Sequence, residues 1–241
     1  MTRCRIFIVA TTLGLSYVLV LYLLDPLISR SLASIIGIPL RTCLPVTGLI
    51  LGLALCLLVS PAFIHGTFAQ YRVFLRESGV VLDRRVAAFV ATATMVTFLL
   101  AAVLGSDPRQ VCHQVALRIG VEPATVAAAA LPPIVEELLF RGIVLGLLLR
   151  YERPWFAIVW SSLLFGLLHF PQGFHAGLSI AIVSVFLFAV PRFLTASAIP
   201  GAFAHLLTNA NVVVPTIWAF LLTSLVAFFV FGTRALKRGS A

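Results

Sequence analysis

The run IFIVATTLGLSYVLVLYLL at residues 6–24 is 19 residues long and holds no charged side chain. Two further uncharged runs, Leu44–Ile64 and Val86–Gly105, have 21 and 20 residues. A helix rises about 1.5 Å per residue, so each run is long enough to cross a hydrocarbon core of about 30 Å. Because open sheets leave backbone groups unsatisfied in lipid, these runs predict transmembrane helices.

The composition points the same way. Apolar residues make up 61% of the 241 residues and charged residues 10%, against roughly 25% charged in a soluble domain. Too little polar surface is present for a soluble globular protein, and the apolar content excludes a disordered one. The net charge is +9, but the basic residues are scattered singly between apolar runs and form no nucleic-acid motif. We therefore expect lipid headgroups, and not nucleic acid, as their partners.

We expect an all-α, polytopic transmembrane bundle of about eight spans in one membrane domain, 1–241. The stretch Ser31–Pro39 is short and predicts an interfacial or re-entrant piece. The five spans that complete the prediction are Thr125–Leu149, Pro154–Phe170, Ala176–Val190, Thr195–Ala210 and Pro215–Gly232.

Loop charges predict the orientation. With the N-terminus inside, inner segments carry twelve Lys and Arg residues, Arg192 among them, and outer segments carry four. Cytoplasmic loops are enriched in basic residues. The sequence thus predicts a multi-pass integral membrane protein with both termini in the cytoplasm.

Polar residues interrupt three spans of the second half of the chain. They occur in VEELLFR (135–141), FGLLH (165–169) and HLLTN (205–209). An ionisable residue inside a span costs at least about 2.5–3.5 kcal/mol on insertion scales, and such residues usually mark function.

Helical spacing predicts how these residues pair. Glu137 and Arg141 are four apart and should form a buried ion pair. Glu136 points about 100° away from Glu137, so it is freer to act elsewhere. The pairs His205 with Asn209 and Phe165 with His169 also share faces, and Phe165 is expected to position its neighbour by packing. Glu136, His169 and His205 all lie roughly 20–24 Å from the predicted inner surface, which brings them to one depth.

A carboxylate, two imidazoles and an amide at one depth favour a hydrolytic centre. In one scheme Glu136 takes a proton from water, His169 holds that water or shuttles its proton, and His205 with Asn209 donates to the oxyanion. In the other, Glu136, His169 and His205 bind a divalent metal such as zinc with one position open for water. Both schemes fit the residues. The sequence has neither the His-Glu-x-x-His zinc helix nor the Gly-x-Ser-x-Gly elbow of serine hydrolases.

The three motifs, Glu136-Glu137-x-x-x-Arg141, Phe165-x-x-x-His169 and His205-x-x-x-Asn209, resemble those of the CPBP family of intramembrane proteases, which includes CAAX prenyl endopeptidases and bacteriocin-processing enzymes. The resemblance covers roughly Leu131 to Asn211. It implies peptide-bond hydrolysis within the membrane, with the first Glu as the catalytic base and the second Glu and the Arg in support.

By the same resemblance the two His and the Asn complete the catalytic set. Use of a metal in the family has been argued both ways, and its members are often described as glutamic-type. The route without a metal is favoured because the sequence shows no obvious strong ligand beyond Glu136 and the two His. The implied partner is a membrane-embedded or lipidated peptide or protein: a prenylated CAAX peptide, a bacteriocin leader peptide or a C-terminal sorting signal.

On this interpretation residues 1–120 supply accessory spans, residues 121–215 form the catalytic core, and residues 216–241 form the last span and a basic tail.

Two other functional classes compete with a protease. Buried Glu, His and Arg also build the proton relays of small-substrate transporters. Against a transporter, the sequence shows no inverted repeat and its polar groups gather in one half. The third class is a catalytically silent scaffold or immunity factor, against which the intact Glu136, His169 and His205 argue.

Overall fold

The computed structural model describes residues 3–37, 40, 47, 48, 50–52, 54, 79, 82–103, 132–209 and 213–238. Every regular element in these ranges is helical, which confirms the all-α class. In chain order the elements are α1 (Arg3–Leu19), the π-helical turn η1 (Val20–Leu24), α2 (Asp25–Ile36), α5 (Arg84–Val103), the π-helical turn η2 (Leu138–Val144), α8 (Leu145–Tyr151), α9 (Pro154–Leu167), the 3₁₀ turn η3 (Phe170–Gln172), α10 (Phe174–Ser184), the π-helical turn η4 (Val185–Ala189), α11 (Val190–Thr195), α12 (Ile199–Asn209) and α13 (Val213–Arg238).

The first helix is longer than the sequence predicts. α1, η1 and α2 follow one another without a break, because the residues at their junctions keep helical backbone angles. Pro26 accounts for the wide turn before it, since a proline ring clashes with the carbonyl four residues earlier. The helix ends at Gly37, whose φ of 73° caps it. Residues 31–36 of the predicted interfacial piece Ser31–Pro39 therefore continue this helix and are no separate element, and whether they lie at the interface stays a prediction.

The helix that carries the VEELLFR motif lies in the hydrophobic core. It runs from residue 132 through η2 and α8 to Tyr151, and six of the seven residues of η2 are buried. After a two-residue turn, Pro154 begins α9, where the missing N–H of proline costs no hydrogen bond. Fully buried apolar side chains on this helix are Val135, Leu139, Phe140, Val144, Leu145 and Leu148.

The segment that follows differs from the prediction in where its helices begin and end. Phe174–Thr195 is one apolar helical stretch of 22 residues, longer than the predicted Ala176–Val190. It stops at Ala196, whose φ of 57° breaks the helix, and α12 begins only at Ile199. With 11 residues α12 extends about 16 Å, so the predicted span Thr195–Ala210 is wrong in its start and is too short to cross alone.

Three helices in the described ranges are long and apolar enough to cross a membrane: Cys4–Ile35, Arg84–Val103 and Phe174–Thr195. Pro154–Leu167 and Val214–Phe229 are apolar but shorter. Most of the predicted span Leu44–Ile64, and residues 125–131 of the fourth, lie outside the described residues. The structure thus supports an integral membrane protein, while the number eight stays a prediction.

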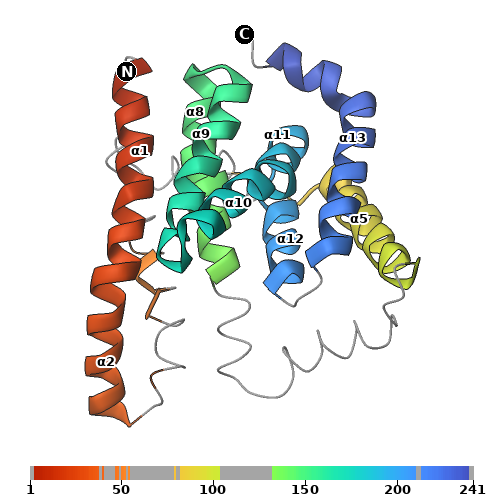
Figure 1. Ribbon diagram of the computed structural model, residues 1–241. Coiled ribbons are helices and arrows are strands. Elements are labelled where there is room, and N and C mark those ends of the chain that lie inside the picture. Colours follow the sequence, from red (N-terminus) through yellow and green to blue (C-terminus); the bar gives the residue numbers. More distant parts are fainter. Residues whose placement is uncertain are drawn as a thin grey trace.

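The helices are arranged with α1 and α2 along one side and α13 with α5 along the other (Figure 1). α8 to α12 fill the space between them, and α10 crosses α9 obliquely (Figure 1). The rings of Phe89 and Phe220 join α5 to α13 at 5.8 Å between centroids. The beginning of α1 and the end of α13 lie at the same end of the molecule (Figure 1). This placement agrees with termini on one membrane side; which side that is stays a prediction.

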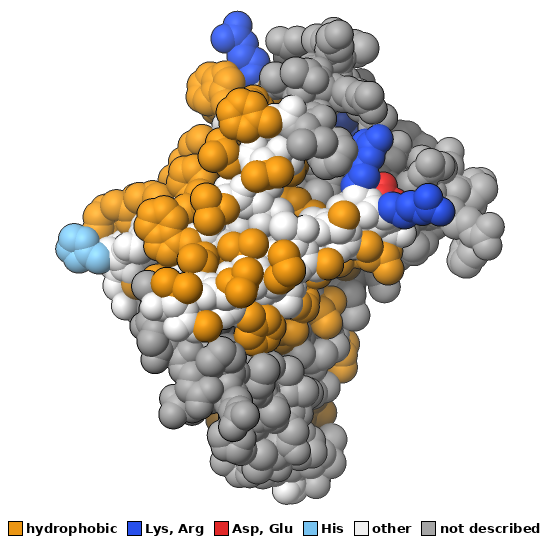
Figure 2. Space-filling model, turned by 90° about the vertical axis from the view of Figure 1, so that its right-hand side faces the viewer, with side chains coloured by type: hydrophobic (Ala, Val, Ile, Leu, Met, Phe, Trp, Pro, Cys, Tyr) orange, Lys and Arg blue, Asp and Glu red, His pale blue; other side chains and the backbone are white. Residues whose placement is uncertain are grey.

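Large apolar side chains cover much of the outer surface. Figure 2 shows them spread over the described part of one face, with charged side chains toward its edges. Phe229 and Phe174, for example, are 74% and 63% exposed. A surface of this kind is unstable in water and suits contact with lipid.

Candidate active site

Two neighbouring carboxylates lie in the middle of the core. Glu136 and Glu137 are 7% and 1% exposed, and Arg141, one turn further along the same helix, is fully buried. The Glu137 Oε2 atom lies 3.5 Å from the Arg141 Nε atom, which confirms the predicted ion pair. The opposite charges of Glu137 and Arg141 stabilise each other in the buried core, where either charge alone would be costly.

Two aromatic rings enclose the Arg141 guanidinium. Its Cζ atom lies 4.2 Å from the ring centre of Phe165 on α9 and 4.9 Å from that of Phe188 in η4. A cation over the face of an aromatic ring is attracted by the ring's quadrupole. The rings therefore hold the guanidinium in place where few hydrogen-bond acceptors reach it.

His205 on α12 contacts both carboxylates. Its Nε2 atom lies 3.8 Å from Glu136 Oε2, and its Nδ1 atom lies 3.6 Å from Glu137 Oε1. These distances exceed that of a direct hydrogen bond. One imidazole thus connects the predicted base, Glu136, to the Glu137–Arg141 pair.

A glycine lets α12 come this close. A Cβ atom placed on Gly201 would lie 2.6 Å from Glu137 Oε2 and 3.3 Å from the Phe188 Cα atom. Gly201 and His205 are four residues apart, so they face the same way on α12. The approach of His205 to the carboxylates therefore depends on the missing side chain at position 201.

Phe165 lies between the two histidines. Its ring centre is 5.0 Å from the His169 ring and 5.7 Å from the His205 ring. The His169 Nδ1 atom is 3.2 Å from the Phe165 carbonyl oxygen. Because a carbonyl only accepts, Nδ1 carries the proton in this bond, and Nε2 is left as an acceptor when the ring is neutral.

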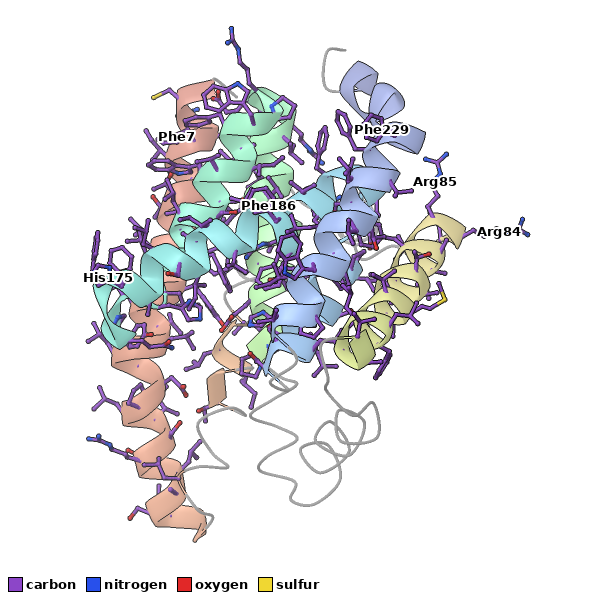
Figure 3. All side chains as sticks on the ribbon, turned by 45° about the vertical axis from the view of Figure 1, so that its right-hand side comes forward. Phe7, Arg84, Arg85, His175, Phe186 and Phe229 are labelled. Atoms are coloured by element: carbon purple, nitrogen blue, oxygen red, sulfur yellow. The ribbon has the colours of Figure 1, made fainter. Side chains whose placement is uncertain are left out.

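The structure brings Glu136, Glu137, Arg141, Phe165 and His205 into direct contact, and places His169 beside Phe165. Asn209 is the last residue of α12, half-buried and one turn beyond His205. Its predicted role is a proposal below. A third histidine, His175, lies exposed at the outer tip of α10, away from this group (Figure 3).

Two residues at the site have no counterpart in the sequence motifs. The Tyr22 hydroxyl in η1 donates to the carbonyl of Leu168, the residue before His169. Arg192 in α11 donates from Nε to the Arg141 carbonyl at 3.1 Å and is 6% exposed. It is therefore an interior residue and not one of the loop charges. Both residues bond to backbone carbonyls of distant helices, and such partners leave no pattern in a sequence.

A third polar residue the motifs leave out is Asp25. Its carboxylate is buried and accepts hydrogen bonds from Ser29 at 3.0 Å and from Thr47. The sequence prediction ended the first span at Leu24, just before this residue. The longer helix brings Asp25 inside the fold, where two hydroxyl groups satisfy it.

The fit of a metal was tested on the donor groups. Within the described residues, no group of three or more His, Cys, Asp or Glu side chains is arranged to hold a metal ion. Glu136 and His205 face each other, and the Nδ1 atom of His169 is engaged with its own helix, which leaves Nε2 as the ring nitrogen that could bind a water or a metal.

Comparison with known proteins agrees with the motifs. Residues 120–211 match the family model described as type II CAAX prenyl endopeptidase Rce1-like. No curated protein and no solved structure matches the chain. The matched stretch encloses the two carboxylates, Arg141, Phe165, both histidines and Asn209. Over the stretch 120–211 the chain is thus similar to the type II CAAX prenyl endopeptidases, a result that supports the resemblance of its motifs to those of the CPBP proteases.

Proposed function

We propose that the protein is an intramembrane endopeptidase in which Glu136 activates a water molecule for attack on a peptide bond of a membrane-associated substrate. The observation that carries the proposal is the buried Glu136 carboxylate, 3.8 Å from the Nε2 atom of His205 on a different helix. A carboxylate and an imidazole at this range in a low-dielectric core are the parts that general base catalysis needs.

The chemical steps follow from the hydrogen-bonding capacities of the groups. Glu136 takes one proton of the water as its oxygen adds to the substrate carbonyl carbon. The tetrahedral intermediate then collapses, the carbon–nitrogen bond breaks, and the proton passes from Glu136 to the leaving amine. The products are a new carboxylic acid and a new amine, the acid then gives its proton to the amine to leave a carboxylate and an ammonium group, and the base returns to its starting state.

The histidines take different parts. Both ring nitrogens of His205 face carboxylates, so its part is to hold Glu136 and Glu137 in place. The Nε2 atom of His169, an acceptor in the tautomer described above, holds the second hydrogen of the attacking water. Asn209 supplies an amide N–H to the oxyanion. These parts revise the sequence-based scheme, in which His205 also donated to the oxyanion.

The substrate class is proposed from the family. A type II CAAX prenyl endopeptidase acts on prenylated C-terminal peptides, and the apolar surface of this protein suits a substrate that arrives from the membrane. We propose a prenylated CAAX-type peptide as the first substrate to test. Bacteriocin leader peptides and C-terminal sorting signals are tested in the same assay. The match to a protease family does not favour the transporter or the silent scaffold.

The test is cleavage of a prenylated CAAX peptide by the purified protein in detergent, with products identified by mass. The wild type should release the residues that follow the prenylated cysteine, while Glu136→Gln should lose about 100-fold or more of kcat, the range that one general base contributes. Glu152→Gln, in the turn before α9, is the matched control and should keep full activity. Equal cleavage by wild type and Glu136→Gln would overturn the mechanism.

A second test concerns the metal. After treatment with a strong chelator and its removal, the protein should keep its full activity, because no step above uses a metal. If the treated protein loses its activity and added zinc restores it, the route without a metal is contradicted. That result would favour the second scheme, with Glu136, His169 and His205 as ligands.

A further inference from the structure

The wide turn η2 changes the hydrogen bonding directly after the catalytic motif. In an α-helix the N–H of Leu145 would donate to the carbonyl of Arg141. Here it donates to the carbonyl of Phe140 instead, one residue earlier. The Arg141 carbonyl thus loses its α-helical partner in a buried part of the protein, where an unsatisfied carbonyl is costly.

Arg192 supplies a donor to that carbonyl. Its Nε atom lies 3.1 Å from the Arg141 oxygen, although the two residues are 51 positions apart in the chain. Arg192 is 6% exposed. A buried cation on α11 is therefore bonded to the backbone of the turn that carries the Arg141 side chain.

Gly79 packs closely against the Arg192 guanidinium. A Cβ atom placed there would lie 2.6 Å from the Arg192 Cζ atom, and Gly79 has a φ of 77°. The Gly79 carbonyl accepts from the Ala198 N–H at 2.8 Å and from the Ser197 hydroxyl at 3.0 Å. The guanidinium thus has Gly79 close against it in addition to its bond to the Arg141 carbonyl, which limits its movement.

We propose that Arg192 is a positioning residue for the peptidase: by holding the Arg141 carbonyl in the wide turn, it fixes the Arg141 side chain against Glu137, and so sets His205 and Glu136 in their reactive arrangement. The inference rests on the proposed function. The contacts that carry it form one chain, from Arg192 to the Arg141 backbone, then from the Arg141 side chain to Glu137. Glu137 in turn contacts His205, which contacts Glu136.

The main variant is Arg192→Met, which keeps length and apolar packing but removes the donor. Its kcat on the prenylated CAAX peptide should fall about 10- to 100-fold with KM within about twofold, because small misplacements of catalytic groups cost rates of this order while substrate contacts stay. Arg192→Lys keeps a cationic donor and should recover most of the lost kcat. Arg153→Met, which removes an exposed Arg from the turn before α9, is the matched control and should behave as wild type.

Coupling between Arg192 and Glu137 distinguishes a positioning role of Arg192 from a merely structural one. If Arg192 acts through the Arg141–Glu137 pair, then adding Arg192→Met to Glu137→Gln should lower kcat by less than about threefold more, since the chain is already broken. If the fold-losses of kcat in the two single variants multiply in the double variant, the proposal is overturned. A folded Arg192→Met protein with wild-type kcat would overturn it as well. If Arg192→Met fails to fold, then Arg192→Lys decides, and its kcat must stay within about threefold of wild type. A wild-type protein that cleaves no substrate would refute the proposed function itself, a result distinct from all of these.

Discussion

Glu136 and Glu137 are adjacent in sequence, yet their surroundings differ. Glu137 is paired with the buried Arg141 and contacts His205, whereas Glu136 faces the other ring nitrogen of His205. The ion pair makes Glu137 a structural group, and the proposal makes Glu136 the reactive one. Helical spacing already predicts this division, because positions four apart share a face and positions five apart do not.

The difference should appear in stability. Glu137→Gln leaves the Arg141 charge buried without its carboxylate, which should lower the free energy of unfolding by about 3 kcal/mol or more. Glu136→Gln leaves the Glu137–Arg141 ion pair in place and should change the free energy of unfolding by less than about 1 kcal/mol. Unfolding of the two variants in detergent, followed by circular dichroism, makes the comparison. Equal losses of stability in Glu137→Gln and Glu136→Gln would contradict the structural role of Glu137 and the reactive role of Glu136.

At the scale of elements, the position of α12 decides the geometry of the site. The helix approaches the carboxylates through Gly201 and presents His205 one turn later. The sequence predicts that His205 and Asn209 share a face. It does not predict where α12 begins, because the left-handed conformation of Ala196 depends on the surrounding fold and not on the residue type.

Gly201→Ala tests this approach. The added methyl group would lie 2.6 Å from Glu137 Oε2, so α12 must move away and take His205 with it. We expect kcat to fall about tenfold or more while the protein still folds. Ala202→Ser adds one atom at the next, half-buried position and should leave kcat near that of wild type. An unchanged kcat in Gly201→Ala would show that the packing of α12 does not control the site.

The contacts within one helix could be predicted from the sequence, and several contacts between helices could not. The Glu137–Arg141 pair follows from spacing alone. The meeting of Glu136 with His205 follows only from their matched depth, and the structure adds the contact itself. Tyr22 and Arg192 could not be predicted, because each recognises a backbone carbonyl, which every residue has.

At the scale of the whole molecule, the apolar surface and the three long apolar helices indicate an integral membrane protein. The length of apolar runs predicts this class well. The exact number of spans is harder to predict, because buried helices such as α12 are apolar without being long enough to cross.

The placement of both helix ends gives a prediction for the whole chain. The start of α1 and the end of α13 lie at one end of the molecule, and the basic residues predict that this end is cytoplasmic (Figure 1). In sealed right-side-out vesicles, protease should remove neither an N-terminal nor a C-terminal tag, and in inside-out vesicles it should remove both. Removal of one tag in each preparation would contradict a shared side.

The central claim is that Glu136 activates the water that cleaves the substrate. A single turnover of the prenylated CAAX peptide in ¹⁸O-labelled water tests it most directly, with the product carboxylate analysed by mass for the wild type and for Glu136→Gln. We predict one ¹⁸O atom in the new carboxylate formed by the wild type and at least about 100-fold slower product formation by the variant. Labelled product formed by Glu136→Gln at the wild-type rate would contradict the account.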